Sequence, residues 1–208
     1  MWCFMRRTVA IGIQSFEKII EGNYFYVDKT PFIKEWWESG DSVTLITRPR
    51  RFGKTLNMSM LEQFFSVNYA GKKKLFEGLS IWNEEKYRKL QGTYPVLSLS
   101  FANIKEHTYE NAKQKMYQIL VDMYENHRFL LEEGYLEGTE VDFFRSVNMD
   151  MKETTATQAI HKLCKFLARY YNKNVIVLID EYDTPMQEAY VHGYWEELVS
   201  FTRSMFNS

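Results

Sequence analysis

Apolar residues recur along this chain at spacings that alternate between those of helices and those of strands. Helical spacing predicts helices directly after Gly53, over about 108–127, over about 155–171, and from 194 to 206. Runs rich in β-branched and aliphatic residues predict strands at 96–101 and 175–179. The second run is five consecutive apolar residues, the pattern of a parallel strand buried on both faces. Helices that alternate with strands indicate the α/β class with a mainly parallel sheet.

The first fifty residues predict three smaller elements. Residues 24–27 are aromatic and β-branched and predict a short strand. A helix is expected from Thr30, as a hydroxyl N-cap before a proline, to about Gly40. Another strand is predicted at 43–47, before an arginine-rich loop. No repeat or linker divides the chain, so we expect one domain with an extension at 1–41 and a core at 42–208.

Composition narrows the possible classes of function. The chain has 26 Lys+Arg against 27 Asp+Glu and a net charge of −1, which gives no overall attraction to nucleic acid or to acidic membranes. No apolar run approaches the roughly 20 residues needed to span a bilayer, and the start is not a signal peptide. A soluble, cytoplasmic protein without a membrane partner is expected. The 2 cysteines and 4 scattered histidines predict neither a disulfide framework nor a zinc site.

The arginine-rich loop is the first candidate site. Residues 48–55 match the phosphate-loop pattern G-x-x-x-x-G-K-[ST] at every position except the first, where Arg48 replaces glycine. The pattern needs a strand before the loop and a helix whose first N–H groups face the phosphates, and both are predicted here. Lys54 would reach the β- and γ-phosphates, and Thr55 would offer its hydroxyl to Mg²⁺. The expected nucleotide-binding residues are Arg50, Arg51, Phe52, Gly53, Lys54, Thr55 and Leu56. A basic turn before an amphipathic helix is the alternative.

The second candidate site follows the apolar run at 175–179. An aspartate at the carboxyl end of a buried strand holds the magnesium in P-loop enzymes, and Asp180 has this position. Glu181 comes next, where a carboxylate can orient and activate the attacking water. The two motifs occur in the required order, so we predict a nucleotide site with Thr55 and Asp180 at the metal and Glu181 as the catalytic residue. An acidic turn at a strand end is the alternative.

Weaker candidates carry charge near these motifs. Asp183 could join the metal shell, although a turn aspartate before Thr-Pro is the simpler explanation. Asp28 and Lys29 could place a charged pair near the base or ribose of a nucleotide. A strand end followed by a helix cap explains these two residues equally well.

With these motifs in view, the chain resembles the AAA-ATPase-like family, which is found widely in bacteria and often carries a C-terminal PD-(D/E)XK-type nuclease domain. The resemblance covers nearly the whole chain and rests on residues 16–20, 26–30, 48–55 and 179–185. A missing first glycine is typical of that family. The resemblance implies a P-loop NTPase of the ASCE type, in which the Walker B aspartate precedes a catalytic glutamate, with ATP and Mg²⁺ bound. It also implies a further sensor strand beyond residue 208, so the sheet is expected to be truncated after the Walker B strand.

Three functions remain as hypotheses. The first is an ATP-binding domain whose intact form hydrolyses ATP and couples hydrolysis to a conformational change. The second is a nucleotide-dependent interaction module that binds ATP with negligible turnover. The third is a nucleic-acid-handling ATPase of a nuclease system, which draws on the basic segments 48–51 and 72–74. A nucleic-acid or protein partner would then be bound through a region after residue 208.

Overall fold

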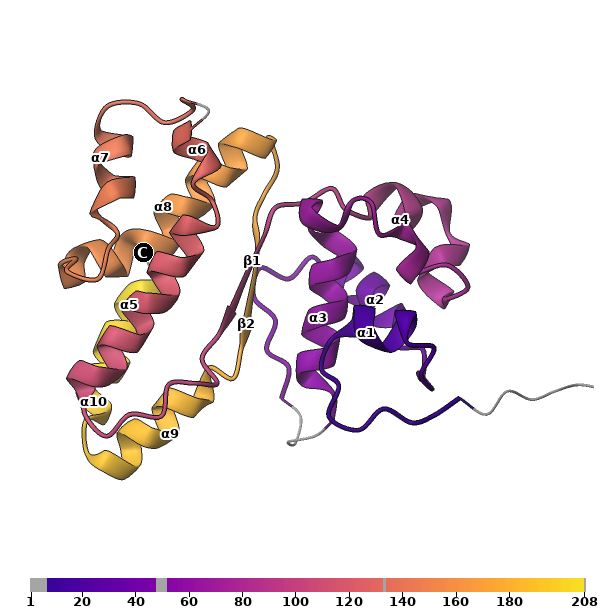
Figure 1. Ribbon diagram of the computed structural model, residues 1–208, viewed down its shortest axis with the longest axis horizontal. Helices are drawn as coiled ribbons and strands as arrows, with labels where there is room; N and C mark the ends of the chain where they lie inside the picture. Colours follow the sequence, from indigo (N-terminus) through magenta and orange to yellow (C-terminus); the bar gives the residue numbers. More distant parts are fainter. Residues whose placement is uncertain (1–6, 48–51, 133, 208) are drawn as a thin grey trace, which may run out of the picture. The chain divides into compact units, whose positions relative to one another are not determined.

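The computed structural model describes residues 7–47, 52–132 and 134–207 (Figure 1). Contacts divide the chain into two compact units, Met1–Val96 and Leu97–Ser208. Each unit is described by itself. The described residues are mainly helical and include one pair of parallel strands, which is compatible with the predicted α/β class. The P-loop sheet order, its truncation and the predicted division at residues 41 and 42 stay predictions.

Helices form most of the first unit. They are α1 (Phe16–Glu21), α2 (Pro31–Ser39), α3 (Lys54–Phe65) and α4 (Glu85–Leu90), with the 3-10 turns η1 (Val67–Tyr69), η2 (Lys73–Leu75) and η3 (Ser80–Asn83). The helices predicted from Pro31 and after Gly53 are confirmed. Buried aromatic rings hold these elements together: Phe76 stacks on Phe16 at 5.2 Å between ring centroids and meets Phe64 edge-on at 5.1 Å. Such pairs add about 0.5–1.5 kcal/mol each beyond the burial of their area.

Neither strand predicted in the first unit is formed. At 24–27 the structure has only an isolated parallel bridge between Phe25 and Val9, and residues 43–47 form no strand. Val43 is 88% exposed and Leu45 is 62% exposed. β-Branched residues favour a strand only where neighbouring strands and a covering layer complete a sheet. The described part of this unit gives the 43–47 run neither, so the prediction of a strand before the phosphate loop was wrong.

The second unit packs long helices against the strand pair. β1 (Val96–Ser100) and β2 (Ile176–Asp180) are hydrogen-bonded neighbours. Between them in sequence come α5 (Tyr109–Glu125), α6 (Phe129–Glu132), α7 (Thr139–Ser146) and α8 (Glu153–Tyr171), and after β2 come α9 (Asp183–His192) and α10 (Trp195–Phe206). These bounds confirm the strands predicted at 96–101 and 175–179. They also confirm the helices predicted at 108–127, 155–171 and 194–206.

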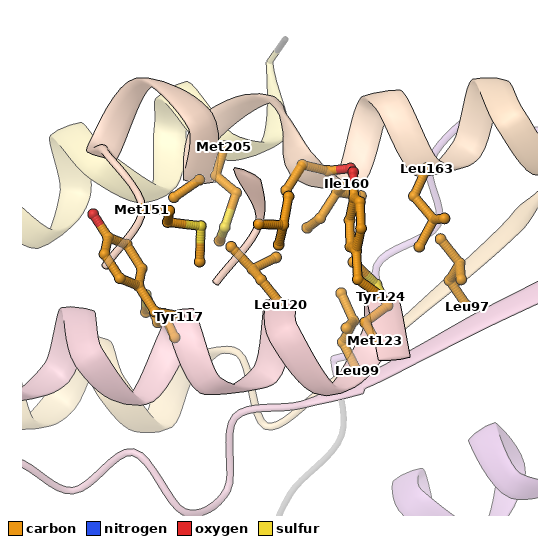
Figure 2. Packing of buried hydrophobic residues seen from close by; sticks show 14 of the residues in the cluster. Leu97, Leu99, Tyr117, Leu120, Met123, Tyr124, Met151, Ile160, Leu163 and Met205 are labelled. Atoms are coloured by element: carbon orange, nitrogen blue, oxygen red, sulfur yellow. The ribbon is translucent and has the colours of Figure 1, made fainter. Parts of the chain in front are cut away.

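A hydrophobic cluster fills the interior of the second unit (Figure 2). Leu97 and Leu99 of β1 contribute to it, together with side chains from α5, α8 and α10. The hydroxyl of Tyr124 in α5 donates a hydrogen bond to the carbonyl of Ala159 in α8 at 2.9 Å. Burial raises the pKa of Tyr124, so its hydroxyl stays a donor. This hydrogen bond joins α5 to α8, and β2 follows α8 in the sequence.

Within the described residues of the second unit, helices pack on one face of the strand pair. Inward Leu97 and Leu99 alternate with Ser98 and Ser100, which are exposed, and Val177 of β2 is 36% exposed. Side chains of a strand alternate between its two faces, so this pattern means that the described helices of the second unit cover only the face of Leu97 and Leu99. The predicted burial of 175–179 on both faces was therefore wrong. A continuous apolar run permits two covered faces but does not require them.

Candidate phosphate-binding and acidic sites

The described part of the predicted phosphate loop begins at Phe52, because Arg48, Arg50 and Arg51 lie outside the described residues. Gly53 immediately precedes α3 and has a φ of 75° and a ψ of 26°. This left-handed conformation costs a residue with a side chain about 1–2 kcal/mol, whereas glycine adopts it freely. Glycine at this position therefore lets the chain turn sharply into the helix.

The start of α3 concentrates positive charge. Lys54 and Thr55 lie in its first turn, which contains no acidic residue. The first hydrogen bond back to the loop runs from the Asn57 N–H to the Gly53 carbonyl at 2.9 Å. The N–H groups before Asn57 have no carbonyl partner inside the helix and carry a partial positive charge. A helix start of this kind suits a phosphate group. Leu56, the last predicted binding residue, is half-buried in the same turn.

Lys29 lies beside this helix start. A Cβ atom built on Gly53 would lie 3.6 Å from the Lys29 Nζ atom. Lys29 belongs to the segment just before α2, which was predicted either to contact a nucleotide or to cap a helix. The structure separates the two charged residues of that segment, since Asp28 takes the capping role and Lys29 approaches Gly53 of the predicted phosphate loop.

Asp28 holds the start of α2 through both oxygens of its carboxylate. Oδ1 accepts hydrogen bonds from the Thr30 N–H at 2.9 Å and the Thr30 hydroxyl at 2.7 Å. Oδ2 accepts them from the Ser80 N–H at 2.7 Å and the Ser80 hydroxyl at 2.6 Å. Burial alone would raise the pKa of Asp28, but the hydrogen bonds from Ser80 and Thr30 hold it below its usual value. The predicted hydroxyl cap by Thr30 was wrong, because Thr30 donates to Asp28 and accepts from the Ile81 N–H.

The acidic candidates lie at the carboxyl edge of the strand pair. Asp180 ends β2, and its carbonyl accepts a hydrogen bond from the Phe101 N–H at 3.1 Å, so the ends of the two strands lie level. One carboxylate oxygen of Asp180, Oδ1, accepts from the Glu181 N–H at 3.0 Å. Ligands of parallel sheets bind at this edge. Asp180 therefore lies at the carboxyl edge of the strand pair, and its role at a metal stays a prediction.

Glu181 follows with a strained backbone. Its φ of 52° is left-handed, a conformation that residues other than glycine seldom adopt. Its carbonyl accepts a hydrogen bond from the Thr184 N–H at 3.1 Å, and its Oε2 accepts a longer one, of 3.4 Å, from the Thr184 hydroxyl. Strain of this kind persists only where the surroundings impose it, and it clusters at functional sites. The presence of a glutamate at this position in the sequence does not predict a left-handed backbone.

Asp183 has a role in helix geometry. It is the first residue of α9, and its Oδ2 accepts a hydrogen bond from the Gln187 side chain at 3.1 Å. A negative charge in the first turn of a helix is stabilising. This arrangement supports the explanation of Asp183 as a turn and helix-start residue.

Replacing Glu181 tests the strain at this position. We expect Glu181→Gly to be more stable than Glu181→Ala by about 1 kcal/mol, because both remove the carboxylate and only alanine keeps a Cβ in the left-handed conformation. Urea denaturation measures the difference. Glu188, inside α9, is the matched control, since glycine there should be less stable than alanine by about 1 kcal/mol. Equal stability of the two variants at 181 would contradict a left-handed Glu181.

The donors for a magnesium ion would be few. Within the described ranges, no group of three or more His, Cys, Asp or Glu residues could hold a metal ion. Magnesium needs no such group beside a nucleotide, because phosphate oxygens and water complete its six ligands. A hydroxyl from Thr55 and a carboxylate from Asp180 are oxygen donors that fit this chemistry.

The described chain contains no helix that combines the length and apolar character needed to cross a bilayer.

Comparisons with known proteins agree with the motifs. A family model described as "Predicted AAA-ATPase" matches residues 10–208. The chain is 31% identical over 182 residues to an "Uncharacterized protein in vnfD 5'region" from Azotobacter chroococcum mcd 1, with 87% of this chain and 30% of that protein covered. It thus spans less than a third of that relative's length. No solved structure matches the chain. Because the family model covers nearly all of it, the chain belongs to the AAA-ATPase-like family.

Proposed function

We propose that the chain is the ATP-binding part of an ATPase whose intact form couples Mg-ATP hydrolysis to a conformational change. The observation that carries this proposal is the start of α3, where a left-handed Gly53 leads into a first turn with Lys54, Thr55 and no acidic residue. Family membership supports the choice of ATP, since the matched model is that of a predicted AAA-ATPase.

In this proposal, the N–H groups of α3 and the Lys54 ammonium bind the phosphates, and Arg50 and Arg51 add charge from the loop before them. The Thr55 hydroxyl and the Asp180 carboxylate hold Mg²⁺, which neutralises charge on the transferred phosphoryl group when bound. The Glu181 carboxylate takes a proton from the attacking water. Its place directly after β2 supports that role, as does the strain in its backbone.

A nucleotide-dependent interaction module with negligible turnover is the second candidate. The exposed 43–47 run favours it, since no strand in the described residues delivers the phosphate loop. The contact between Thr184 and Glu181 also favours it, because it draws the glutamate carboxylate toward α9. The involvement of nucleic acid stays a hypothesis.

Calorimetry with Mg-ATP tests the proposal, and we expect saturable binding to the folded chain. Steady-state phosphate release at saturating ATP then separates an ATPase from an interaction module, and it is best measured on both this chain and the full-length protein. A folded chain that gives no binding signal with Mg-ATP, while circular dichroism shows its helices intact, would rule out both candidates.

A further inference from the structure

The backbone of Lys29 is held from several sides. Its N–H donates a hydrogen bond to the Tyr26 hydroxyl at 3.3 Å, and its carbonyl accepts one from the Phe32 N–H at 3.0 Å. The residues on either side, Asp28 and Thr30, are hydrogen-bonded to each other and to η3. Thr30 is also fully buried. The starting point of the Lys29 side chain is therefore fixed, which lowers the entropy that its ammonium loses when it binds a ligand.

Among the described residues, the Lys29 ammonium lies beside the predicted phosphate loop without a counter-charge. It lies 3.6 Å from the position that a Gly53 Cβ would occupy. Within the described residues it makes no hydrogen bond or ion pair, whereas Lys34 and Lys72 of the same unit pair with glutamates at 2.6 Å and 2.7 Å. The neighbouring carboxylate, Asp28, is occupied by Thr30 and Ser80.

Three sources of positive charge therefore converge at the start of α3. They are the Lys29 ammonium, Lys54 in the first turn, and the N–H groups of the helix. Like charges gathered at one helix start repel each other, and a bound anion relieves the repulsion. Gly53 directly precedes the lysine that reaches the β- and γ-phosphates in this motif, and the Lys29 ammonium lies beside Gly53.

We propose that Lys29 is a second phosphate-binding lysine, which contacts the terminal phosphates of the bound nucleoside triphosphate from outside the phosphate loop. This inference rests on the proposed function and deepens it. It assigns the charge at position 29 to the phosphate chain, in contrast to the base or ribose contact that the sequence allowed. The side chain then recognises charge and is indifferent to the base.

Lys29→Met is expected to weaken Mg-ATP binding by roughly ten- to a hundredfold, because it removes one charge-assisted hydrogen bond. Lys29→Arg should restore most of the affinity, since it keeps the positive charge. Lys74→Met is the matched control, because it removes the same charge from an exposed position in η2, and it should leave affinity within about twofold. Calorimetry measures all three, and circular dichroism confirms their fold.

Inorganic tripolyphosphate separates phosphate contacts from base contacts. Its ability to displace a fluorescent ATP analogue should fall in Lys29→Met by the same factor as the affinity for ATP. A loss for ATP without a loss for tripolyphosphate would move Lys29 to the base or ribose and overturn the inference. In the unmodified chain, tripolyphosphate should also protect Lys29, but not Lys74, from an amine-reactive reagent, and this readout is independent of any variant.

The inference and the proposed function fail in different ways. If the unmodified chain does not bind Mg-ATP, both fall. If it binds Mg-ATP and Lys54→Ala weakens binding while Lys29→Met does not, only the inference about Lys29 falls. Equal labelling of Lys29 with and without tripolyphosphate would have the same meaning.

Discussion

Replacing Glu181 by glutamine is expected to lower ATP turnover in the full-length protein by about 10²–10⁴-fold, with ATP affinity unchanged. The amide has the shape of the carboxylate but cannot take a proton from water. In the proposed site, other residues bind the phosphates and the magnesium ion, so ATP affinity should be unaffected. Phosphate release measures the turnover, and calorimetry measures the affinity.

Asp183→Asn is the matched control for this change. It also neutralises an acidic residue after β2, but the Asp183 carboxylate serves the first turn of α9, so turnover should change little. Unchanged turnover in Glu181→Gln would remove Glu181 from the mechanism and leave it as a turn residue.

Lys54→Ala is expected to weaken Mg-ATP binding by roughly ten- to a hundredfold, because a charge-assisted hydrogen bond contributes about 1.5–3 kcal/mol. The left-handed Gly53 and the first N–H groups of α3 stay in place, so residual binding should remain. Calorimetry on the folded variant measures the loss. Lys74→Ala controls for the loss of net charge. Equal affinity of the Lys54 variant and the parent chain would show that the phosphate-loop assignment is wrong.

Elements that depend on local spacing could be predicted from the sequence. The apolar stripes of α5, α8 and α10 recur every three or four residues and repeat within one element, so they predict helices without knowledge of neighbours. The runs at 43–47 and 175–179 are both β-rich, yet only the second forms a strand. A strand needs a partner, and Val96–Ser100 provides one for β2. The sequence of a β-rich run does not indicate which other strand will pair with it.

The same distinction applies to the candidate sites. The motif glycine predicts the sharp turn at Gly53, because few other residues take its conformation. The position of Lys29 depends on the neighbouring Asp28 carboxylate, which accepts a hydrogen bond from Ser80. Asp28 and Ser80 are 52 positions apart in the sequence, and no spacing rule connects them. The strain at Glu181 likewise depends on how β2 meets α9, and glutamate as a residue type gives no sign of it.

The uneven covering of the strand pair affects how copies of the chain would meet at high concentration. Among the described residues, each strand has a single hydrogen-bonded neighbour, so within the second unit its other edge has no strand partner. Ser98 and Ser100 place hydroxyls on the open face, and Val177, which is 36% exposed, adds apolar surface to it. Self-association would therefore begin by backbone pairing along an edge, and charged residues introduced at the edges would improve solubility more than changes to the open face.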